Sequence, residues 1–194
     1  MRDYTIRNDR DFGHIPRVNL IDTSVFILAS IGNDYCWRIV ESQDKSELKF
    51  GFVYGVEKQV IGCLINKYNG LGCSWIYNII KDRNFARLRL ELGRIKYRKE
   101  HGGLVDNDIL TLVRLNEVKC VISLDFSHII KDYPSNNDKF LTPLDFVEKF
   151  DSQLVKLDEA WEKFKKDLEG EKEKLKTQKY KLEDFQDLWI VKYY

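Results

Sequence analysis

The sequence predicts an α/β fold of three layers, in which helices cover both faces of a central, mostly parallel sheet and a helical extension follows at the C-terminus. Two observations predict it. Residues 18–21 and 120–124 are apolar runs with the length of buried strands, and each is followed directly by an aspartate. A helical pattern at 104–115 leads into the second run, and a helix that feeds a strand in this way favours a parallel sheet.

Length and composition are those of one packed domain with an appendage. The chain has 194 residues, of which 43% are hydrophobic and 13% aromatic, and single domains commonly have about 100–200 residues. Lysine and arginine number 32 against 31 aspartates and glutamates, so the net charge is +1. No overall electric field therefore draws the protein onto nucleic acid, and any such binding has to come from a local basic patch.

The chain carries no signal for a zinc site, for secretion or for a membrane span. Its cysteines form no Cys-x-x-Cys pair and have no histidine at zinc-ligand spacing, which predicts reduced thiols; they are Cys36, Cys63, Cys73 and Cys120. The first ten residues are too polar for a secretion signal. No apolar run approaches the roughly 18 residues that a membrane span needs. We expect a soluble, cytoplasmic protein with no membrane partner.

The first strand is predicted at 18–21, after an N-terminal arm, residues 1–16, that is expected to lack strong structure. Asp22 then stands at the carboxyl end of a buried strand, where open α/β sheets bind their ligands. A second interpretation stays open, in which Asp22 only caps the helix that follows and runs to about Ile31. Residues 35–49 have no pattern that assigns them.

Apolar residues recur at three- and four-residue steps in segment 50–65, which favours a helix over a strand. Glu57 lies beside the apolar stripe of that helix, so it is either a site residue or a surface glutamate at the edge of the stripe.

Segment 81–99 is predicted to be a basic amphipathic helix, with eight basic residues against two acidic ones. Either it is a solvated face, or it binds nucleic-acid phosphates while Phe85 and Tyr97 stack on bases. In the second case Arg87, Arg94 and Arg98 are the candidate substrate-binding residues.

The second half of the domain repeats the opening design. Asp106 and Asp108 lie in the first turn of a predicted helix, where acidic residues suit the helix dipole. The second buried strand then ends on Asp125. A short strand near residue 140 precedes a helix that Thr142 is expected to cap, with Pro143 at its first position.

The extension, residues 151–194, is predicted to be a charged helix with an apolar tail. Its apolar residues fall at alternating three- and four-residue steps, as in a coiled-coil seam; they are Leu154, Leu157, Trp161, Phe164, Leu168, Leu175 and Leu182. We expect this helix to pair with a second copy, giving a homodimer, or with a protein partner. The alternative is that it folds back onto its own domain.

Carboxylates at two strand ends and on two helices are expected to converge on one rim of the sheet. Carboxylates that crowd together resist ionisation unless cations lie between them, and oxygen ligands of this kind suit Mg²⁺ or Mn²⁺. Such ions generate a hydroxide nucleophile and stabilise a phosphodiester under attack. The pattern therefore predicts two-metal nuclease chemistry.

These residues resemble the four acidic motifs of PIN-domain nucleases, in the family's order and at broadly its spacing. The motifs are Leu20-Ile-Asp-Thr-Ser24, Val56-Glu57, Asp106-Asn-Asp-Ile-Leu110 and Val121-Ile-Ser-Leu-Asp125. Thr142-Pro-Leu-Asp-Phe146 is similar to the last strand and helix of that fold, so the resemblance covers about residues 17–150.

The resemblance implies a catalytic, metal-binding set with hydroxyl support. Asp22, Glu57, Asp106 and Asp125 would be the catalytic metal ligands, and Thr23, Ser24 and Ser123 would support them by hydrogen bonds. Asp108 is the alternative to Asp106. The position of Ile109, three residues after Asp106, fits the spacing of the family and favours Asp106. The family usually has a further acidic or polar residue just after its last aspartate. Phe126-Ser-His128 departs from that pattern, which leaves open whether one or two metals bind.

The expected function is that of a metal-dependent endoribonuclease, of the toxin-like or the RNA-processing kind. RNA is expected as the substrate because the long arch and helix-hairpin-helix elements of flap-type DNA nucleases are not seen in the sequence. The alternatives are a structure-specific DNA nuclease and a non-catalytic PIN-like scaffold that acts through the C-terminal helix.

Overall fold

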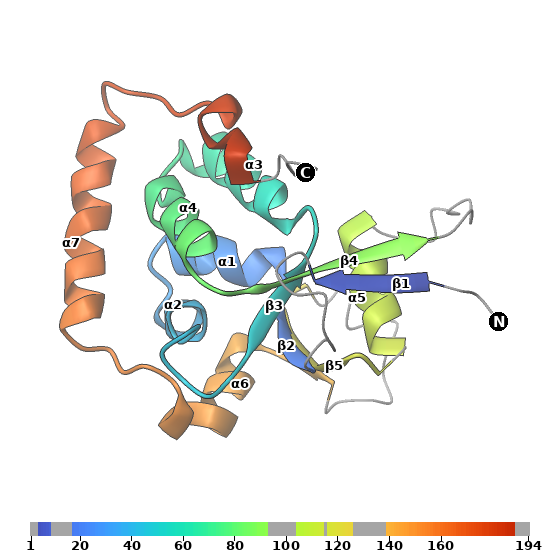
Figure 1. Cartoon of the computed structure of the whole chain (residues 1–194). Helices are drawn as coiled ribbons and strands as arrows, with labels where there is room; N and C mark the ends of the chain where they lie inside the picture. The colour runs from blue at the N-terminus through green and yellow to red at the C-terminus, as the bar shows by residue number, and fades with distance from the viewer. Residues whose placement is uncertain (1–3, 9–16, 93–103, 115, 126–138, 189–194) are drawn as a thin grey trace.

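Six strands form one sheet in the order β1-β4-β3-β2-β5-β6 (Figure 1). The computed structural model describes residues 4–8, 17–92, 104–114, 116–125 and 139–188. The strands are β1 (Tyr4–Asn8), β2 (Val18–Ile21), β3 (Phe50–Val53), β4 (Ala86–Leu92), β5 (Val118–Ile122) and β6 (Phe140–Leu141). The α-helices are α1 (Thr23–Ser30), α2 (Asp34–Glu41), α3 (Val56–Tyr68), α4 (Cys73–Asp82), α5 (Leu104–Arg114), α6 (Pro143–Phe150) and α7 (Glu159–Lys174). Two 3₁₀ helices are η2 (Asp151–Gln153) and η3 (Leu182–Leu188).

Strands β2 to β6 pair with one another in the parallel direction, which confirms the predicted mostly parallel sheet. Strand β1 pairs with β4 in the antiparallel direction, with Tyr4 opposite Leu92. The prediction of an arm without strong structure over 1–16 is therefore wrong for residues 4–8. Backbone N–H and C=O groups along the outer edge of β4 need partners, and β1 supplies them.

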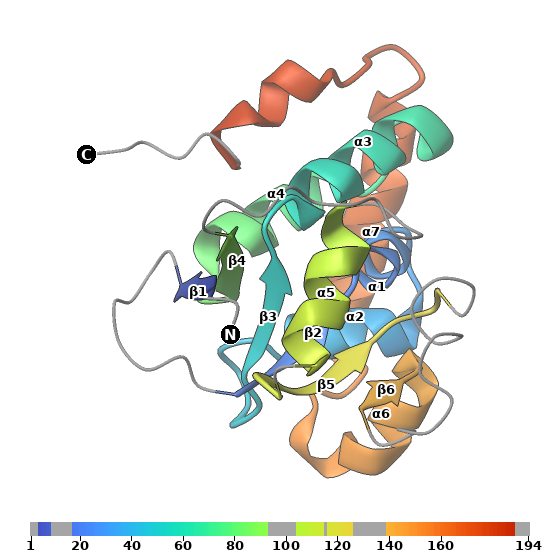
Figure 2. The same cartoon turned by 90° about the vertical axis from the view of Figure 1, so that its right-hand side faces the viewer.

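Helices cover both faces of the sheet, as the three-layer α/β prediction requires. In Figure 1, α1, α2, α3 and α4 lie on one side of β3 and α5 lies on the other; the turned view of Figure 2 places α5 in front of the sheet. Connections between parallel strands are right-handed. The chain moves outward from β2 through β3 to β4, then returns through α5 to β5 on the other side of β2. This change of direction explains why α5 lies on the opposite face.

The segment predicted as one helix over 50–65 is a strand followed by a helix. Phe50, Phe52 and Val53 in β3 are buried on both faces of the sheet, and a strand of that kind is a continuous apolar run without alternation. Gly55 has φ +98° and separates β3 from α3, a left-handed conformation that glycine adopts without steric cost. The three- and four-residue spacing of apolar residues reflects a helix from Val56 onward, and this helix does not extend back into β3.

The predicted basic helix over 81–99 is wrong as far as the structure describes it, because α4 ends at Asp82 and β4 begins at Ala86. The β4 sequence Ala-Arg-Leu-Arg-Leu-Glu-Leu alternates with a period of two, which is a strand pattern. Leucine, arginine and glutamate have high helix propensity, but pairing with β3 and β1 decides the outcome here. Residues 93–99 lie outside the described residues.

The later elements agree with the sequence. Helix α5 and strand β6 occur where they are predicted, and α6 begins at Pro143 with Thr142 as its N-cap. Strand β5 covers residues 118–122 and not the predicted 120–124, so Ser123 and Leu124 separate it from Asp125. Thr142 Oγ1 accepts a hydrogen bond from the Asp145 amide at 3.1 Å, and Asp145 Oδ2 accepts one from the Thr142 amide at 3.2 Å. This reciprocal pair is a capping box, which satisfies two backbone donors at the helix start.

The core lies between the sheet and helices α1 to α4, where Phe26, Phe52 and Phe85 form a cluster with ring centroids 5.5–5.8 Å apart. All four cysteines are free thiols. Burial raises the pKa values of Cys36, Cys73 and Cys120 each to about 12. These three thiols are therefore small apolar core residues that stay protonated at neutral pH.

The C-terminal extension folds back onto its own domain, which is the alternative that the sequence left open. In α7, Trp161 and Phe164 are buried against Trp37 of α2, with ring centroids 5.1 Å and 6.0 Å from that indole. Trp75 of α4 lies 4.9 Å from Phe164. The predicted continuous heptad helix is broken: Asp158 caps α7, and the extension from residue 154 to its start is not helical.

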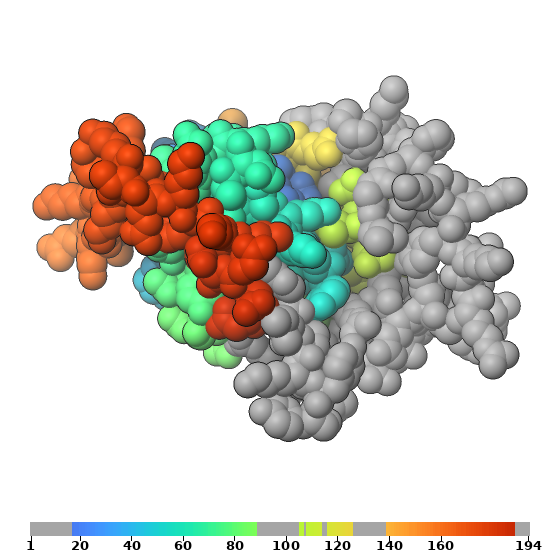
Figure 3. Space-filling model, turned by 90° about the horizontal axis from the view of Figure 1, so that it is seen from above, coloured from blue at the N-terminus to red at the C-terminus, as the bar shows by residue number. Residues whose placement is uncertain are grey.

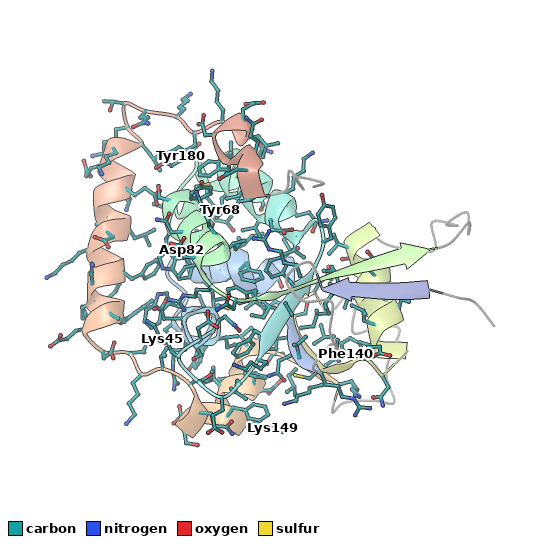
Figure 4. The ribbon with its side chains drawn as sticks, in the orientation of Figure 1. Lys45, Tyr68, Asp82, Phe140, Lys149 and Tyr180 are labelled. Carbon is teal, nitrogen blue, oxygen red and sulfur yellow. The ribbon has the colours of Figure 1, made fainter. Side chains whose placement is uncertain are left out.

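Glu171 joins the end of α7 to the start of α4. It is 9% exposed, and its carboxylate accepts hydrogen bonds from the amides of Gly72 at 2.7 Å and Ser74 at 3.1 Å. Tyr180, labelled in Figure 4, donates to the same carboxylate at 3.3 Å and lies 2.5 Å from Ser74 Oγ. The amides at a helix N-terminus need acceptors, and a carboxylate also suits the helix dipole there.

We expect Glu171→Ala to lower the free energy of unfolding by about 3 kcal/mol, because it leaves buried backbone donors of α4 without an acceptor. Urea denaturation followed by circular dichroism measures this change. The matched control is Glu169→Ala on the same helix, where the exposed pair with Lys172 at 3.8 Å is worth at most about 0.5 kcal/mol. Equal stability of the two variants would contradict the capping role of Glu171.

Candidate functional site at the carboxyl edge of the sheet

The candidate site lies where the direction of the sheet reverses, between the adjacent strands β2 and β5. From β2 the chain builds the sheet outward through β3 and β4 on one side and through β5 and β6 on the other. Ligands of such sheets bind in the crevice at the carboxyl ends of the two strands that flank this point. Asp22 follows β2 directly, and Ser123 and Asp125 follow β5.

Figure 3 looks down on this edge of the molecule. Atoms of the β2–α1 junction (blue), the β3–α3 region (cyan), α5 (yellow-green) and the end of β5 (yellow) adjoin one another there. The segments that carry the predicted carboxylates therefore lie at one end of the molecule. The positions of the individual carboxylates follow from their contacts.

Asp22 is held in place through one of its two oxygens. Its side chain is 4% exposed. Oδ2 accepts hydrogen bonds from the hydroxyls of Ser24 at 2.7 Å and Ser123 at 2.9 Å, and a longer one from the Ser24 amide at 3.4 Å. Within the described residues, the hydrogen bonds that the Asp22 side chain accepts all fall on Oδ2 and none on Oδ1.

Asp22 is also the N-cap of α1, which is what the second interpretation of the sequence expects. An N-cap needs one acceptor for the amides of the first turn. The second and third donors to the same oxygen are hydroxyl groups, which the cap does not require, and Ser123 comes from a different strand.

Ser24 and Ser123 link the ends of the two central strands. Ser24 Oγ accepts a hydrogen bond from the Leu124 amide at 3.1 Å, and Ser123 Oγ accepts one from the Asp125 amide at 2.9 Å. Each serine therefore donates to Asp22 and accepts from the segment after β5. The hydroxyl of Thr23, the third predicted support, donates to Gln59 of α3 at 2.8 Å and not to the Asp22 carboxylate.

Glu57 lies in the first turn of α3 and is fully buried, at 0% exposure. Its Oε2 accepts a hydrogen bond from the Gly55 amide at 3.1 Å, and its Oε1 lies 3.9 Å from Nε of Arg87. The interpretation of Glu57 as a surface residue at the edge of a stripe is therefore wrong. The glutamate is an interior carboxylate with a cationic neighbour.

The remaining candidate carboxylates are partly exposed at the same end of the sheet. Asp106 and Asp108 are half-buried on α5, whose neighbouring Val105 lies beside the β3–α3 turn, since a Cβ on Gly55 would be 3.5 Å from it. Asp125 is also half-buried, and its amide is fixed by Ser123. Both Asp106 and Asp108 stay candidates, because the side chain of each is partly exposed.

Arg87 was predicted to bind nucleic-acid phosphates from a basic helix, but it lies on strand β4. Its side chain is 19% exposed, and its guanidinium donates to the carbonyl oxygens of Ile80 at 3.1 Å and Leu188 at 3.3 Å. It is an interior arginine that joins β4 to α4 and η3. Sequence reasoning missed this because it placed Arg87 on a solvated helix. Arg94 and Arg98, the other two predicted substrate-binding residues, lie outside the described residues.

Asp22 and its neighbours fit a hard divalent cation in their chemistry, with oxygen donors and one carboxylate oxygen without a hydrogen-bond donor. Over the described ranges, however, no group of three histidine, cysteine, aspartate or glutamate side chains is close enough to hold a metal ion. A complete cluster of four carboxylates, as the sequence predicts, is therefore not formed. Mg²⁺ does not require four carboxylates, because it keeps several water ligands and binds to one or two carboxylates.

Comparison with protein-family models, with curated proteins and with solved structures finds no match to this chain. Among the described residues, none of the helices is both long enough and apolar enough to cross a membrane.

Proposed function

We propose that this protein is a PIN-like, metal-dependent endoribonuclease that hydrolyses single-stranded or loop RNA at the carboxyl edge of the sheet. The observation that carries the proposal is the setting of Asp22. A buried carboxylate stands at the switch point of a parallel sheet, held by hydroxyls from two strand ends on Oδ2. That arrangement fixes the direction of Oδ1 before any ligand arrives.

Asp22 and one further carboxylate would hold Mg²⁺ or Mn²⁺, and the further ligand would be Asp125, Asp106 or Asp108. Bound there, a divalent cation activates water and stabilises the charge that develops on a phosphodiester. Ser24 and Ser123 orient the Asp22 carboxylate, because both hydroxyls donate to Oδ2. Rigid support of this kind is what metal ligands need from their neighbours.

Single-stranded RNA is the expected substrate because its bases are unpaired and can be contacted by protein side chains, whereas those of a duplex are stacked and paired. The net charge of +1 gives no long-range attraction. We therefore expect affinity to depend on local contacts and to fall only moderately with salt.

The proposal predicts RNA cleavage in Mg²⁺ or Mn²⁺ that stops completely when a chelator is added. A mixed pool of end-labelled single-stranded RNA, resolved on a denaturing gel, measures it. Protein carrying Asp22→Asn, purified in parallel, controls for contaminating ribonucleases. Cleavage that persists in chelator, or that is equal in the two preparations, would show that the site is wrong.

A non-catalytic PIN-like scaffold is the second candidate, and two observations favour it. No three metal-binding side chains gather among the described residues, and Glu57 lies beside a cation of the protein itself. A scaffold would bind RNA or a partner equally well with and without divalent cations, and it would leave the labelled RNA intact.

A further inference from the structure

The charges of the C-terminal extension are segregated along the chain. Residues 172–181, which we call the lysine segment, contain five lysines and one glutamate. The preceding part of α7, residues 159–171, has three lysines against five acidic residues, and η3 has three acidic residues and no lysine or arginine. A protein whose net charge is only +1 therefore has a local excess of positive charge in the lysine segment.

All five lysines are exposed, but only two of them form an ion pair with a described carboxylate. Lys172 lies 3.8 Å from Glu169, and Lys176 lies 2.6 Å from Glu173. The other three have no ion-pair partner among the described residues; they are Lys174, Lys179 and Lys181.

The helix dipole accounts for only part of this segment. Lysines in the last turn of a helix are stabilised by the negative end of the dipole, and the effect falls off within that turn. Lys172 and Lys174 lie in the last turn of α7, whereas Lys179 and Lys181 come after the helix. The dipole therefore does not stabilise the two later lysines.

Tyr180 anchors the lysine segment to the rest of the protein (Figure 4). Its hydroxyl contacts Ser74 and Glu171, and its ring packs against Gly70, where an added Cβ would lie 2.8 Å from Cδ2 of the ring. Lys179 and Lys181 are exposed on either side of this inward-pointing tyrosine. Because the backbone is already fixed, a ligand that binds these lysines costs less conformational entropy than one that has to order a free loop.

The lysine segment lies on the same face of the molecule as the candidate site. It crosses the top of Figure 1 from the end of α7 to η3. In Figure 3 this part of the chain (red) and the β2–α1 junction (blue) lie on either side of α3. Helix α3 begins at the carboxyl edge, and Gly70, just beyond its end, contacts Tyr180. A helix of 13 residues is about 20 Å long, so a nucleotide chain at the carboxyl edge has to extend only about that far to reach the lysines.

We propose that the lysine segment binds the phosphate backbone of the single-stranded RNA substrate and holds the strand along α3 towards the candidate site. The inference rests on the proposed function, because it names the surface that binds the same substrate. A lysine ammonium group is a compact point charge on a flexible stem, and it binds phosphate without a fixed geometry. A flexible single strand of any sequence fits such a surface, since a positively charged surface follows the backbone and not the bases.

The test measures binding of a fluorescently labelled single-stranded RNA of mixed sequence by fluorescence anisotropy, on the full chain in chelator, over a range of salt concentrations. The test variant combines Lys174→Gln, Lys179→Gln and Lys181→Gln. We expect it to bind RNA at least about tenfold more weakly than the wild type at low salt, because three phosphate contacts are lost. The slope of log affinity against log salt should become shallower by about 2, since each such contact to a single strand contributes about 0.7.

The matched control removes the same charge from the same extension, by combining Lys163→Gln, Lys165→Gln and Lys166→Gln. These lysines are exposed in the first half of α7, where Lys165 pairs with Glu162 at 2.7 Å. The control should keep RNA affinity within about twofold of the wild type and leave the salt slope unchanged, because it removes no phosphate contact. Circular dichroism checks that both variants are folded.

Cleavage kinetics in Mn²⁺ separate the lysine segment from the proposed function. The lysine variant should raise KM for RNA and leave kcat unchanged, as expected when an interaction contributes only to binding. Equal affinity and an equal salt slope, together with cleavage that still requires Asp22, would overturn the lysine segment and leave the nuclease proposal intact. Weaker RNA binding by the lysine variant, without any cleavage that requires Asp22, would support the RNA surface and contradict the nuclease. Wild-type protein that binds vesicles of anionic phospholipid but not RNA would also overturn the inference, since the lysine segment would then bind a membrane.

Discussion

A chain that ends at Phe150 is expected not to remain a folded monomer. It would lose five large apolar side chains that are buried in the whole protein, Leu154, Trp161, Phe164, Phe185 and Leu188. Each such side chain is worth about 1.5–3 kcal/mol relative to exposure, and the whole stability of a domain is about 5–15 kcal/mol. The truncation also uncovers Trp37, which is 1% exposed beneath α7.

Thermal melting and light scattering measure the outcome, with aggregation or a much lower melting temperature expected. The matched control is a full-length chain with Lys163→Ala and Lys166→Ala, two exposed positions of α7, which should melt close to the wild type because surface substitutions usually change stability by less than about 0.5 kcal/mol. A truncated chain that stayed folded, and whose mass fell from dimer to monomer, would instead support the pairing helix that the sequence predicts.

The sequence identified strands that end on carboxylates and helices that begin with caps, because both signals are local. Asp22 after β2 and Thr142 before α6 are examples in which a few neighbouring residues determine the backbone. A capping box or a buried strand of four residues is specified within a single turn or a single pleat. Local chemistry of this kind can be recognised without a structure.

The wrong assignments arose where tertiary pairing outweighs local preference. Residues 86–92 have residues of high helix propensity, yet β4 lies between two strands that satisfy its backbone. Likewise, β3 has no alternation because both its faces are covered. An apolar run of that length is compatible with a helix and with a strand until its neighbours are known.

The contacts of the candidate site can likewise be divided into local ones and long-range ones. The two serines that hold Asp22 stand beside the acidic residues in the sequence, so they could be named in advance. The approach of Arg87 to Glu57, at 3.9 Å, joins β4 to α3, and the Leu188 carbonyl comes from 101 residues further along the chain. Contacts across such a separation depend on the complete fold, and no local pattern encodes them.

Asp22→Asn is expected to reduce the rate of RNA cleavage at least on the order of 100-fold, because substitutions of groups that merely support a metal ligand already cost about 10–100-fold. Asparagine has nearly the same shape as aspartate but lacks the charge that a divalent cation needs. The initial rate of cleavage at saturating Mn²⁺ measures the loss. The matched control is Asp158→Asn, which alters the N-cap of α7 far along the chain from the strand ends and should leave the rate unchanged.

The same substitution also tests how Asp22 is stabilised in the absence of metal. Mutual repulsion in a crowded acidic rim, the arrangement expected from the sequence, would make Asp22→Asn no less stable than the parent protein. In the structure Asp22 accepts three hydrogen bonds, and those to a charged acceptor are worth more than those to a neutral one. We therefore expect a loss of about 1–2 kcal/mol in the free energy of unfolding in chelator. A gain in stability would mean that repulsion from neighbouring carboxylates outweighs the bonds from Ser24 and Ser123.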